Sequence, residues 1–448
     1  MLNVLILNGS PAGDNSITLY TLKYIQKHCP GCSFEVLHVG QKIKQYEKDF
    51  TPCRDALERA NIIVFAYPVY TFLVPAQLHR FIELMKEHKV NIAGKCATQI
   101  STSKHFYDIT AHRFIEENCA DLGLNYVKGL SADMDDLLTA QGRKEAIDFF
   151  RFVLWSRRQG IFEPSPLLQT KAAPERQETA AAAPSLGAKA CKKKTVIVAD
   201  FGDEAADAPL KEMIRAFRTA LPMQSEVVNI REFPFAGGCL GCFRCAASGK
   251  CIYKDGFDSY LREHIQSASA LVYAYSIKDH SMGYRFKLFD DRQFCNGHRT
   301  VTMGKPVAYL VNGALEAEPN LKVLMEARAQ VGGNYLAGIA LAPTDAAKVA
   351  AKLTYAVKYN YLPPKDFYGV GGMKIFRDLI FQMQGLMKED HRFYKAHGFY
   401  DFPQKRMGRV LGMYAVGAMM NNENFRKKAG NKINEGMVMP YEAVMKKY

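Results

Sequence analysis

The chain has 448 residues, which is too long for one compact core, so two or three domains are expected. Apolar residues make up 48% and charged residues 23%, an ordinary globular composition that excludes a disordered, collagenous or coiled-coil chain. The net charge of +14 is compatible with an anionic cofactor, an acidic protein, a membrane surface or a nucleic acid. The sequence has neither zinc-finger spacing nor an RNP-type signature, which argues against nucleic acid as a partner.

Neither a membrane span nor a leader peptide is predicted. The longest uncharged stretches, residues 329–344 and 410–422, are shorter than the ~18–20 apolar residues of a spanning helix, and Gly, Asn or Pro interrupt them. The N-terminus, MLNVLILNGSP, lacks a basic region and a cleavage site, so we expect a cytoplasmic protein. Eleven cysteines in a reducing compartment indicate metal or redox chemistry rather than disulfides.

In the first 162 residues, apolar runs typical of strands alternate with helical patterns. The expected strands are Val4–Leu7, Phe34–Val39, Ile62–Ala66, Ala97–Ile100 and Tyr126–Leu130. The clearest helical patterns are Ile17–His28, Pro75–Glu87 and Ala111–Leu122. This alternation predicts a parallel sheet with helices on both faces.

The same rhythm returns after an Ala/Pro-rich segment, residues 163–194, which we interpret as a linker. The second set of expected strands is Thr195–Ala199, Glu226–Asn229, Leu271–Ala274, Val307–Val311 and Leu336–Leu341. The sequence therefore predicts an α/β protein with two tandem, doubly wound, five-stranded parallel sheets in residues 1–162 and 195–359. A basic helical extension, residues 360–448, is expected after them.

Offsets between the two copies locate an insertion. Val4–Leu7 falls on Val196–Ala199 at an offset of 192 residues, and Ala60–Tyr67 falls on Ala268–Tyr275 at 208. The second copy is therefore 16 residues longer between its first and third strands. That interval contains a cluster of four cysteines.

A candidate phosphate-binding loop, NGSPAGDNSIT (residues 8–18), lies between the first predicted strand and its helix. Small hydroxyl side chains and backbone N–H groups converge on an anion at such a helix N-terminus. A turn capped by Asn and Ser is the alternative reading. Because ligands of doubly wound sheets lie beyond the carboxyl ends of the strands, residues 67–78 and 101–106 should complete the site.

The motifs G-S-P…N-S-I-T and P-V-Y…P-A-Q-L resemble the flavodoxin-like NAD(P)H-dependent FMN reductases over about residues 1–155. The resemblance implies a flavodoxin-like fold and bound FMN. It places the phosphate on Ser10, Asn15, Ser16, Ile17 and Thr18, and the ring beside Pro68, Val69, Tyr70, Thr71, Phe72, Thr102 and Ser103. The corresponding loop of the second copy, residues 200–207, carries four carboxylates that would repel a phosphate, so one FMN per chain is expected.

The four clustered cysteines indicate a metal centre. Their spacing is Cys239-x2-Cys242-x2-Cys245-x5-Cys251. Three thiolates at x2 intervals suit one face of a [4Fe–4S] cluster, and a fourth reaches the remaining iron. Zinc, which usually takes two separated C-x2-C pairs, and free redox thiols are the alternatives. The module also resembles that of the iron-sulfur flavoproteins, whose compact cysteine motif follows strand two.

Together these features predict an FMN-dependent iron-sulfur oxidoreductase, to which we assign no catalytic side chain. The donor is expected to be NAD(P)H, or an acidic ferredoxin or flavodoxin that docks on residues 361–448, where 15 Lys and Arg face 8 Asp and Glu. An electron-transfer flavoprotein without its own substrate and a zinc-stabilised flavodoxin-fold binding module are the alternative functions. Relatives of this family commonly pair their domains, which suggests a homo-oligomer or internal pairing of the two copies.

Overall fold

The computed structural model describes residues 1–164 and 191–424. The chain divides into two compact units, Met1–Phe393 and Tyr394–Tyr448, of which the second is described as far as residue 424. Within the described residues, no helix is both long and apolar enough to cross a bilayer. Both predicted sheets lie in the first unit.

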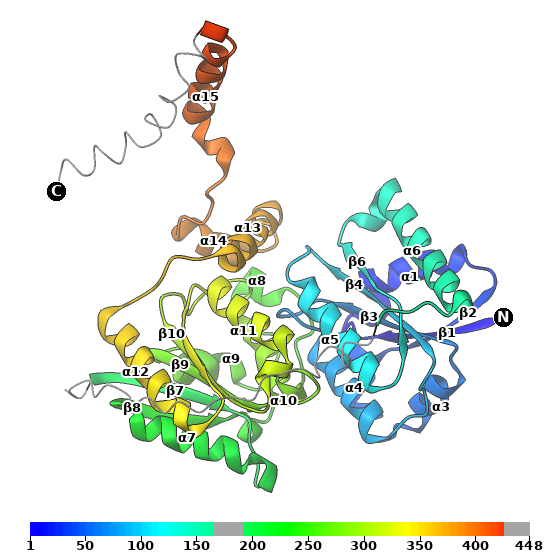
Figure 1. Cartoon of the computed structure of the whole chain (residues 1–448), viewed down its shortest axis with the longest axis horizontal. Helices are drawn as coiled ribbons and strands as arrows, with labels where there is room; N and C mark the ends of the chain where they lie inside the picture. Colours follow the sequence, from blue (N-terminus) through cyan, green and yellow to red (C-terminus); the bar gives the residue numbers. More distant parts are fainter. Residues whose placement is uncertain (165–190, 425–448) are drawn as a thin grey trace. The chain divides into compact units, whose positions relative to one another are not determined.

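The first sheet has six parallel strands in the order β2-β1-β3-β4-β5, with β6 also paired to β4 (Figure 1). Its strands are β1 (Leu2–Asn8), β2 (Cys32–Leu37), β3 (Ile62–Pro68), β4 (Cys96–Ser103), β5 (Asn125–Tyr126) and β6 (Leu130–Asp133). Its helices are α1 (Ile17–Lys27), α2 (Val39–Tyr46), α3 (Thr51–Arg59), α4 (Ala76–Glu87), α5 (Asp108–Asp121) and α6 (Ala140–Gln159). Alternate residues of β1 enter different cores, which is why its sequence is continuously apolar.

The second sheet has five parallel strands in the order β11-β10-β9-β7-β8. Its strands are β7 (Cys191–Ala199), β8 (Met223–Asn229), β9 (Ala270–Ser276), β10 (Pro306–Asn312) and β11 (Tyr335–Ala340). Its helices are α7 (Ala208–Ala220), α8 (Arg244–Ser248), α9 (Phe257–Tyr260), α10 (Gly283–Arg292), α11 (Pro319–Gly332) and α12 (Pro343–Tyr359). When the strands of each sheet are numbered from one in chain order, both sheets have the strand order 2-1-3-4-5. This order confirms the predicted flavodoxin-like repeat.

Three boundaries differ from those predicted. The second strand ends at Leu37 because α2 begins at Val39. The expected strand over Tyr126–Leu130 is divided into β5 and β6, which pair with different parts of β4. Strand β7 begins at Cys191, inside the segment interpreted as a linker, while residues 165–190 of that segment lie outside the described residues.

The two sheets share one continuous apolar core. It joins one face of the first sheet to one face of the second, and the opposite faces pack on separate cores beneath α1 with α6 and α7 with α12. Helix α4 packs against α10, and α5 packs against α11. Because α10 and α11 are the counterparts of α4 and α5, the two copies face each other through equivalent helices.

The loops after the third strand of each copy, residues 70–73 and 278–281, adopt the same unusual turn. Each closes with an antiparallel bridge between its first and last residues. Each also contains two consecutive non-glycine residues with positive φ: 41° and 70° at Thr71 and Phe72, and 51° and 58° at Asp279 and His280. Such backbone is costly for residues other than glycine, so contacts around the turns must maintain it.

Reciprocal hydrogen bonds join the two copies beside these turns. The Ala76 N–H donates to Asp291 Oδ2 (2.8 Å), and the Tyr284 N–H donates to Glu83 Oε1 (2.9 Å). At the offset of 208 residues Ala76 corresponds to Tyr284 and Glu83 to Asp291, so one bond is the counterpart of the other. The acidic residue of each helix thus satisfies a backbone donor at the start of the facing helix.

A buried ion pair fixes the turn of the first copy. Lys287 and Asp291 are paired with side chains that are 0% exposed. The Lys287 ammonium also donates to the Tyr70 carbonyl oxygen (2.9 Å) and to Thr71 Oγ1 (2.7 Å), and Thr71 Oγ1 donates to Asp291 (2.7 Å). Burial raises the pKa of Asp291, and the Lys287 charge opposes that rise.

The C-terminal extension is helical, as predicted, but it divides between the two units. Helix α13 (Phe367–Gln382) and the start of α14 (Lys388–Ala396) belong to the first unit. There Tyr107 Oη donates to the Tyr368 carbonyl oxygen (2.6 Å), and the rings of Phe106 and Phe376 stack with centroids 4.1 Å apart. Helix α15 (Met407–Met420) belongs to the second unit.

Removing the Lys287 charge should destabilise the first unit strongly. Lys287→Met leaves the Asp291 carboxylate buried beside uncharged groups, a change that costs about 3–5 kcal/mol of unfolding free energy. Urea unfolding followed by circular dichroism measures it. Lys144→Met, which breaks the exposed Lys144–Asp148 pair, is the control and should change the value by less than about 0.5 kcal/mol. Equal effects of the two substitutions would contradict this account of the pair.

Candidate functional site

The loop between β1 and α1 forms a compact turn at a helix N-terminus. Ser10 and Ser16 are buried, whereas Asn15 and Ile17 are exposed. Ser16 caps α1, its Oγ accepting from the Leu19 N–H (3.3 Å), and Ser10 Oγ accepts from the Ala12 N–H (3.3 Å). Ser16 therefore caps the helix, as the alternative interpretation of this loop predicts. The first N–H groups of α1 have no carbonyl partners inside the helix. A phosphate suits such a position.

The three predicted loops of the first copy meet at Thr102, at the end of β4. Thr18 Oγ1 donates to Thr102 Oγ1 (2.9 Å), and the Val69 N–H donates to the Thr102 carbonyl oxygen (3.3 Å). Both threonines are buried. The next residue, Ser103, accepts from the His105 N–H (2.9 Å) and so turns the chain away from the strand.

The segment predicted to border the flavin ring, Pro68–Phe72, leaves β3 as a rigid turn. Pro68, Val69, Tyr70 and Thr71 are partly buried, and Phe72 is buried. The Phe72 ring lies against Phe106 and Tyr107, with centroids 5.0 and 4.5 Å away. Aromatic groups from the segments after β3 and β4 are therefore in contact, as a flat ligand at this edge requires.

The four clustered cysteines lie in the loop between β8 and α9, and α8 forms part of that loop. Cys242 is exposed, and the other three are partly buried. Burial raises the pKa of Cys239 and raises that of Cys245 to about 11, and neighbouring thiols of the cluster contribute to both shifts. The Gly241 N–H donates to Cys239 Sγ (3.5 Å), a contact of the kind that supports a metal-bound sulfur.

The cysteine loop packs directly against the predicted flavin loops of the first copy. Gly241, at φ 61°, has the Tyr70 hydroxyl where a Cβ would lie, so any larger side chain would collide with that hydroxyl. Gln77 Nε2 donates to the Cys239 carbonyl oxygen (3.4 Å). Burial raises the pKa of Tyr70 well above its usual value, and the Cys239 thiol contributes to that rise. The docked copies thus bring the cysteine loop to the edge of the predicted flavin site.

Two arginines of the second copy hold the cysteine loop in shape. Arg292 forms a bidentate pair with Asp255 (2.7 and 2.8 Å) and donates to the Gly237 carbonyl oxygen (3.0 Å). Arg262 donates to the Gly249 carbonyl oxygen (2.7 Å). The loop is therefore ordered by protein contacts of its own.

The structure adds residues near the cluster that the spacing did not reveal. The charges of Cys245 and Cys251 help to raise the pKa of Cys295, which burial takes to about 12, so a fifth thiol lies nearby. Asp390, in α14, is buried and accepts from the His298 N–H (3.0 Å) and pairs with Arg299. These residues come from segments distant in sequence, and no local motif marks them.

The phosphate position of the second copy is occupied by its own side chains. Asp207 accepts from the Gly202 N–H (2.6 Å), as a phosphate oxygen would. Arg231 pairs with Asp200 (2.7 Å), Glu204 (3.2 Å) and Asp207 (3.4 Å). Three of the four carboxylates that predicted the loss of FMN from this copy therefore form an internal ion-pair cluster, and the fourth, Asp203, pairs with Lys211 (3.3 Å).

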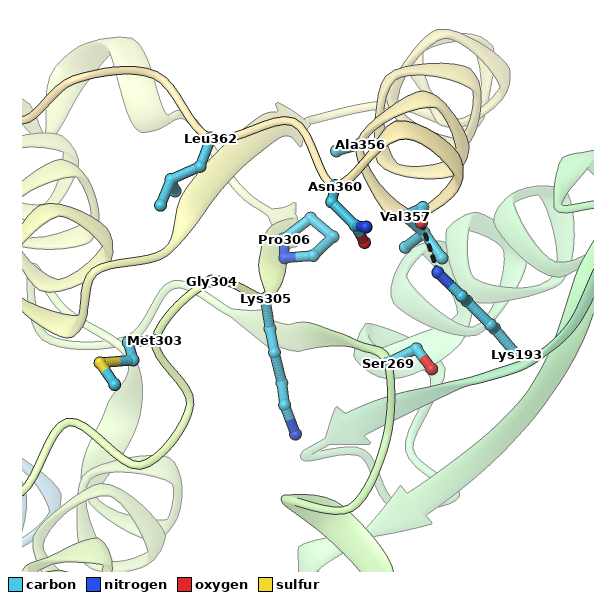
Figure 2. A pocket seen from close by; sticks show the side chains of 10 residues that line it. All are labelled: Lys193, Ser269, Met303, Gly304, Lys305, Pro306, Ala356, Val357, Asn360 and Leu362. Carbon is cyan, nitrogen blue, oxygen red and sulfur yellow. Dashed lines mark hydrogen bonds between the residues drawn. The ribbon is translucent and has the colours of Figure 1, made fainter. Parts of the chain in front are cut away.

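A pocket of about 400 Å³ lies at the other end of the second sheet (Figure 2). Ser269 and Pro306 stand at the amino ends of β9 and β10, and Lys193 donates to the Val357 carbonyl oxygen at its rim (2.7 Å). Because ligands of doubly wound sheets bind beyond the carboxyl ends of the strands, this pocket is separate from the candidate site.

The strand order, together with the loops after β1, β3 and β4, defines the first copy as a flavodoxin-like domain. Residues 2–112 match the family model described as NADPH-dependent FMN reductase, which confirms the resemblance indicated by the motifs. The N-terminal domain is therefore related to these flavin reductases. The match ends before the cysteine loop, so the iron-sulfur part of the resemblance stays a prediction.

Solved structures similar to this chain include several flavoenzymes, whereas no curated protein matches it. One is a flavoenzyme NAD(P)H:(acceptor) oxidoreductase from Paracoccus denitrificans, 19% identical over 35% of this chain and 96% of that chain, with a TM-score of 0.29. Another is an FMN-dependent NADH-azoreductase from Bacillus anthracis in complex with FMN, 13% identical over 36% and 100%, with a TM-score of 0.26. A third is an NAD(P)H:quinone oxidoreductase from Methanothermobacter marburgensis, 14% identical over 36% and 96%, with a TM-score of 0.25.

Placing a carboxylate at Thr18 should weaken FMN binding. In Thr18→Asp the added charge lies at the helix N-terminus where the phosphate is expected, and a penalty of about 2–3 kcal/mol lowers affinity ~30–150-fold. Quenching of FMN fluorescence measures it. Thr219→Asp, at an exposed position of α7, is the control. Unchanged affinity in Thr18→Asp, or two FMN per wild-type chain, would contradict this site.

Proposed function

We propose that the protein is an NAD(P)H-dependent FMN oxidoreductase in which a [4Fe–4S] cluster exchanges electrons with the flavin. FMN would bind the first copy, and Cys239, Cys242, Cys245 and Cys251 of the second would hold the cluster. The observation that carries the proposal is the contact between the two loops, where Tyr70 lies against Gly241. It brings the two predicted redox sites of one chain together.

The residues of the first copy have distinct roles in this proposal. Ser10, Ser16 and Thr18 line the turn that would hold the phosphate, and Thr102 ties that turn to the loop after β3. The rigid turn at Tyr70–Phe72 would border the ring. When bound, FMN accepts a hydride from a nicotinamide and the cluster carries single electrons, so the chain's own task is to position and shield them.

The spacing of the thiols supports a cluster better than a single zinc ion. Four sulfurs around one zinc ion lie ~3.8 Å from one another. Among residues 1–164 and 191–424, neither of the two ligand groups whose atoms all fall within 4.8 Å contains a cysteine. The thiols are nonetheless close enough for their charges to raise the pKa values of their neighbours. A cubane holds its thiolates further apart, because four iron atoms lie between them.

The second copy would serve as the cluster domain and would not bind a second flavin. Arg231 and its three carboxylate partners occupy the turn where a phosphate would bind. Displacing Arg231 would leave Asp200 and Asp207, which are 13% and 10% exposed, without their cationic partner. The duplication thus supports one flavin and one cluster per chain.

NAD(P)H is the electron donor that the family match favours. An acidic ferredoxin or flavodoxin remains a prediction from the charge of residues 361–448. Six of the 15 Lys and Arg in that segment, including Arg426, Lys427 and Lys428, lie outside the described residues. Cytoplasmic location also remains a prediction.

The proposal is tested by the composition of protein purified anaerobically. One FMN, four iron and four sulfide per chain are expected, with a visible spectrum that combines flavin and iron-sulfur absorption. Steady-state oxidation of NADH or NADPH then separates an enzyme from a pure electron carrier. Zinc in place of iron, or a colourless protein, would refute the proposal and favour the binding module.

Cys242→Ala should remove the cluster and spare the flavin. Cys242 is the exposed thiol of the motif, so its loss should release iron with little disturbance of the core. Reduced-state EPR should lose the cluster signal while FMN content stays at one per chain. Transfer to a one-electron acceptor should slow more than transfer to a hydride acceptor.

Cys32→Ala, which removes a free cysteine of β2, is the matched control and should keep the EPR signal. A cluster signal that survives Cys242→Ala would contradict the ligation. Undiminished one-electron transfer in the cluster-free variant would contradict the coupling.

A further inference from the structure

Helix α4 and the turn of the second copy bring together a group of potential metal ligands that no redox role uses. His79 and Glu83 lie four residues apart on α4, and Asp279 reaches them from the turn after β9. One ligand atom from each lies within 4.8 Å of the others. The group bridges the two flavodoxin-like copies.

Polar atoms of His79 and Asp279 in this group lack hydrogen-bond partners. Both ring nitrogens of His79, which is 0% exposed, and Asp279 Oδ2 are buried without a partner. His79 Nε2 is 3.9 Å from Glu83 Oε1, too far for a hydrogen bond. Buried polar atoms are rarely unpaired, and a ring nitrogen of His79 within 4.8 Å of a carboxylate oxygen of Asp279 indicates a missing ligand.

One carboxylate oxygen of Glu83 and one of Asp279 accept hydrogen bonds from cations, which fixes the orientation of both carboxylates. Lys278 donates to Glu83 Oε2 (3.0 Å), as does Arg80 (3.1 Å), and Lys86 donates to Asp279 Oδ1 (2.9 Å). These three cations also contact Glu47, Glu87 and Asp121, and Asp121 pairs in addition with His280.

The counterpart of this group in the other half of the interface already contains a cation. At the offset of 208 residues, His79 corresponds to Lys287, Glu83 to Asp291 and Asp279 to Thr71. There the Lys287 ammonium lies between Asp291, Thr71 and a backbone carbonyl. In the histidine half, an imidazole stands at the position of the Lys287 ammonium, and the carboxylate of Asp279 stands at the position of Thr71.

We propose that His79, Glu83 and Asp279 bind a divalent metal ion that takes the place of the lysine ammonium and joins the two copies. One imidazole nitrogen and two carboxylate oxygens suit zinc or manganese. Burial lowers the pKa of His79 to about 3, so its imidazole is neutral and has a lone pair to donate. Ligand atoms around a tetrahedral ion lie ~3.4 Å apart, so binding needs only a small contraction.

The neighbouring group of Glu117, His280 and Glu318 does not fit a metal in the same way. His280 Nδ1 is 3.0 Å from Glu318 and its Nε2 is 3.0 Å from Asp121. With both ring nitrogens engaged by carboxylates, this imidazole has no lone pair to offer. The group is an ion-pair cluster, and it serves as an internal control.

Manganese is the probe that separates this site from the cysteine loop, because Mn²⁺ favours oxygen and nitrogen over thiolate ligands. Full-length protein is treated with EDTA and titrated with MnCl2, and EPR measures the unbound ion. Wild type should bind one Mn²⁺ per chain. Asp279→Asn should weaken binding at least ~100-fold, since it removes a charged ligand. Asp148→Asn, in an exposed acidic position of α6, should leave binding unchanged.

His79→Lys tests the equivalence with Lys287. This variant should lose Mn²⁺ binding, yet its unfolding temperature without metal should be at least that of EDTA-treated wild type, because a tethered ammonium replaces the ion. Unaltered FMN binding would show that both variants fold. The proposal is overturned if wild type binds no Mn²⁺, if Asp279→Asn and His79→Lys bind it as wild type does, or if Glu117→Gln abolishes binding.

Discussion

The buried contact between α4 and α10 is the interaction on which the rest of the first unit depends. Each helix offers a carboxylate to a backbone N–H at the start of the other, and each supports a turn with two residues at positive φ. Buried carboxylates are tolerated only with partners, so the two copies can dock in only a narrow range of geometries. The Lys287–Asp291 pair meets that requirement in one half.

Docking through equivalent helices explains how a duplication can divide a function. In the first copy Ser16 caps α1 at this turn, whereas the second copy fills the corresponding turn with Arg231 and its carboxylates. The cysteine loop is inserted where the second copy faces the β3 loop of the first, so Tyr70 and Gly241 meet. Neither copy could form this composite edge by itself, because its two loops belong to different domains.

The interface is nearly symmetric in backbone and asymmetric in charge. Lysine at 287 and histidine at 79 occupy equivalent positions, and threonine at 71 is replaced by aspartate at 279. The lysine half contains its own ion pair, whereas in the histidine half Lys278 and Lys86 pair with Glu83 and Asp279 and the ring nitrogens of His79 have no partner. Helix α13 adds a further contact through Phe376 and Tyr368, which cover the segment after β4.

The sequence by itself determined the repeated α/β fold and predicted the flavin loops and the cysteine loop, since apolar periodicity and short motifs are local properties. The strands predicted from the sequence mostly lie within a few residues of the observed ones. The prediction was wrong at the end of β2, where α2 begins, and at the edge strand that is divided into β5 and β6. Only the tertiary structure decided that the cysteine loop lies against Tyr70, that Cys295 and Asp390 lie near it, and that His79, Glu83 and Asp279 converge. Those relations join residues between about 45 and 200 positions apart, for which local sequence carries no signal.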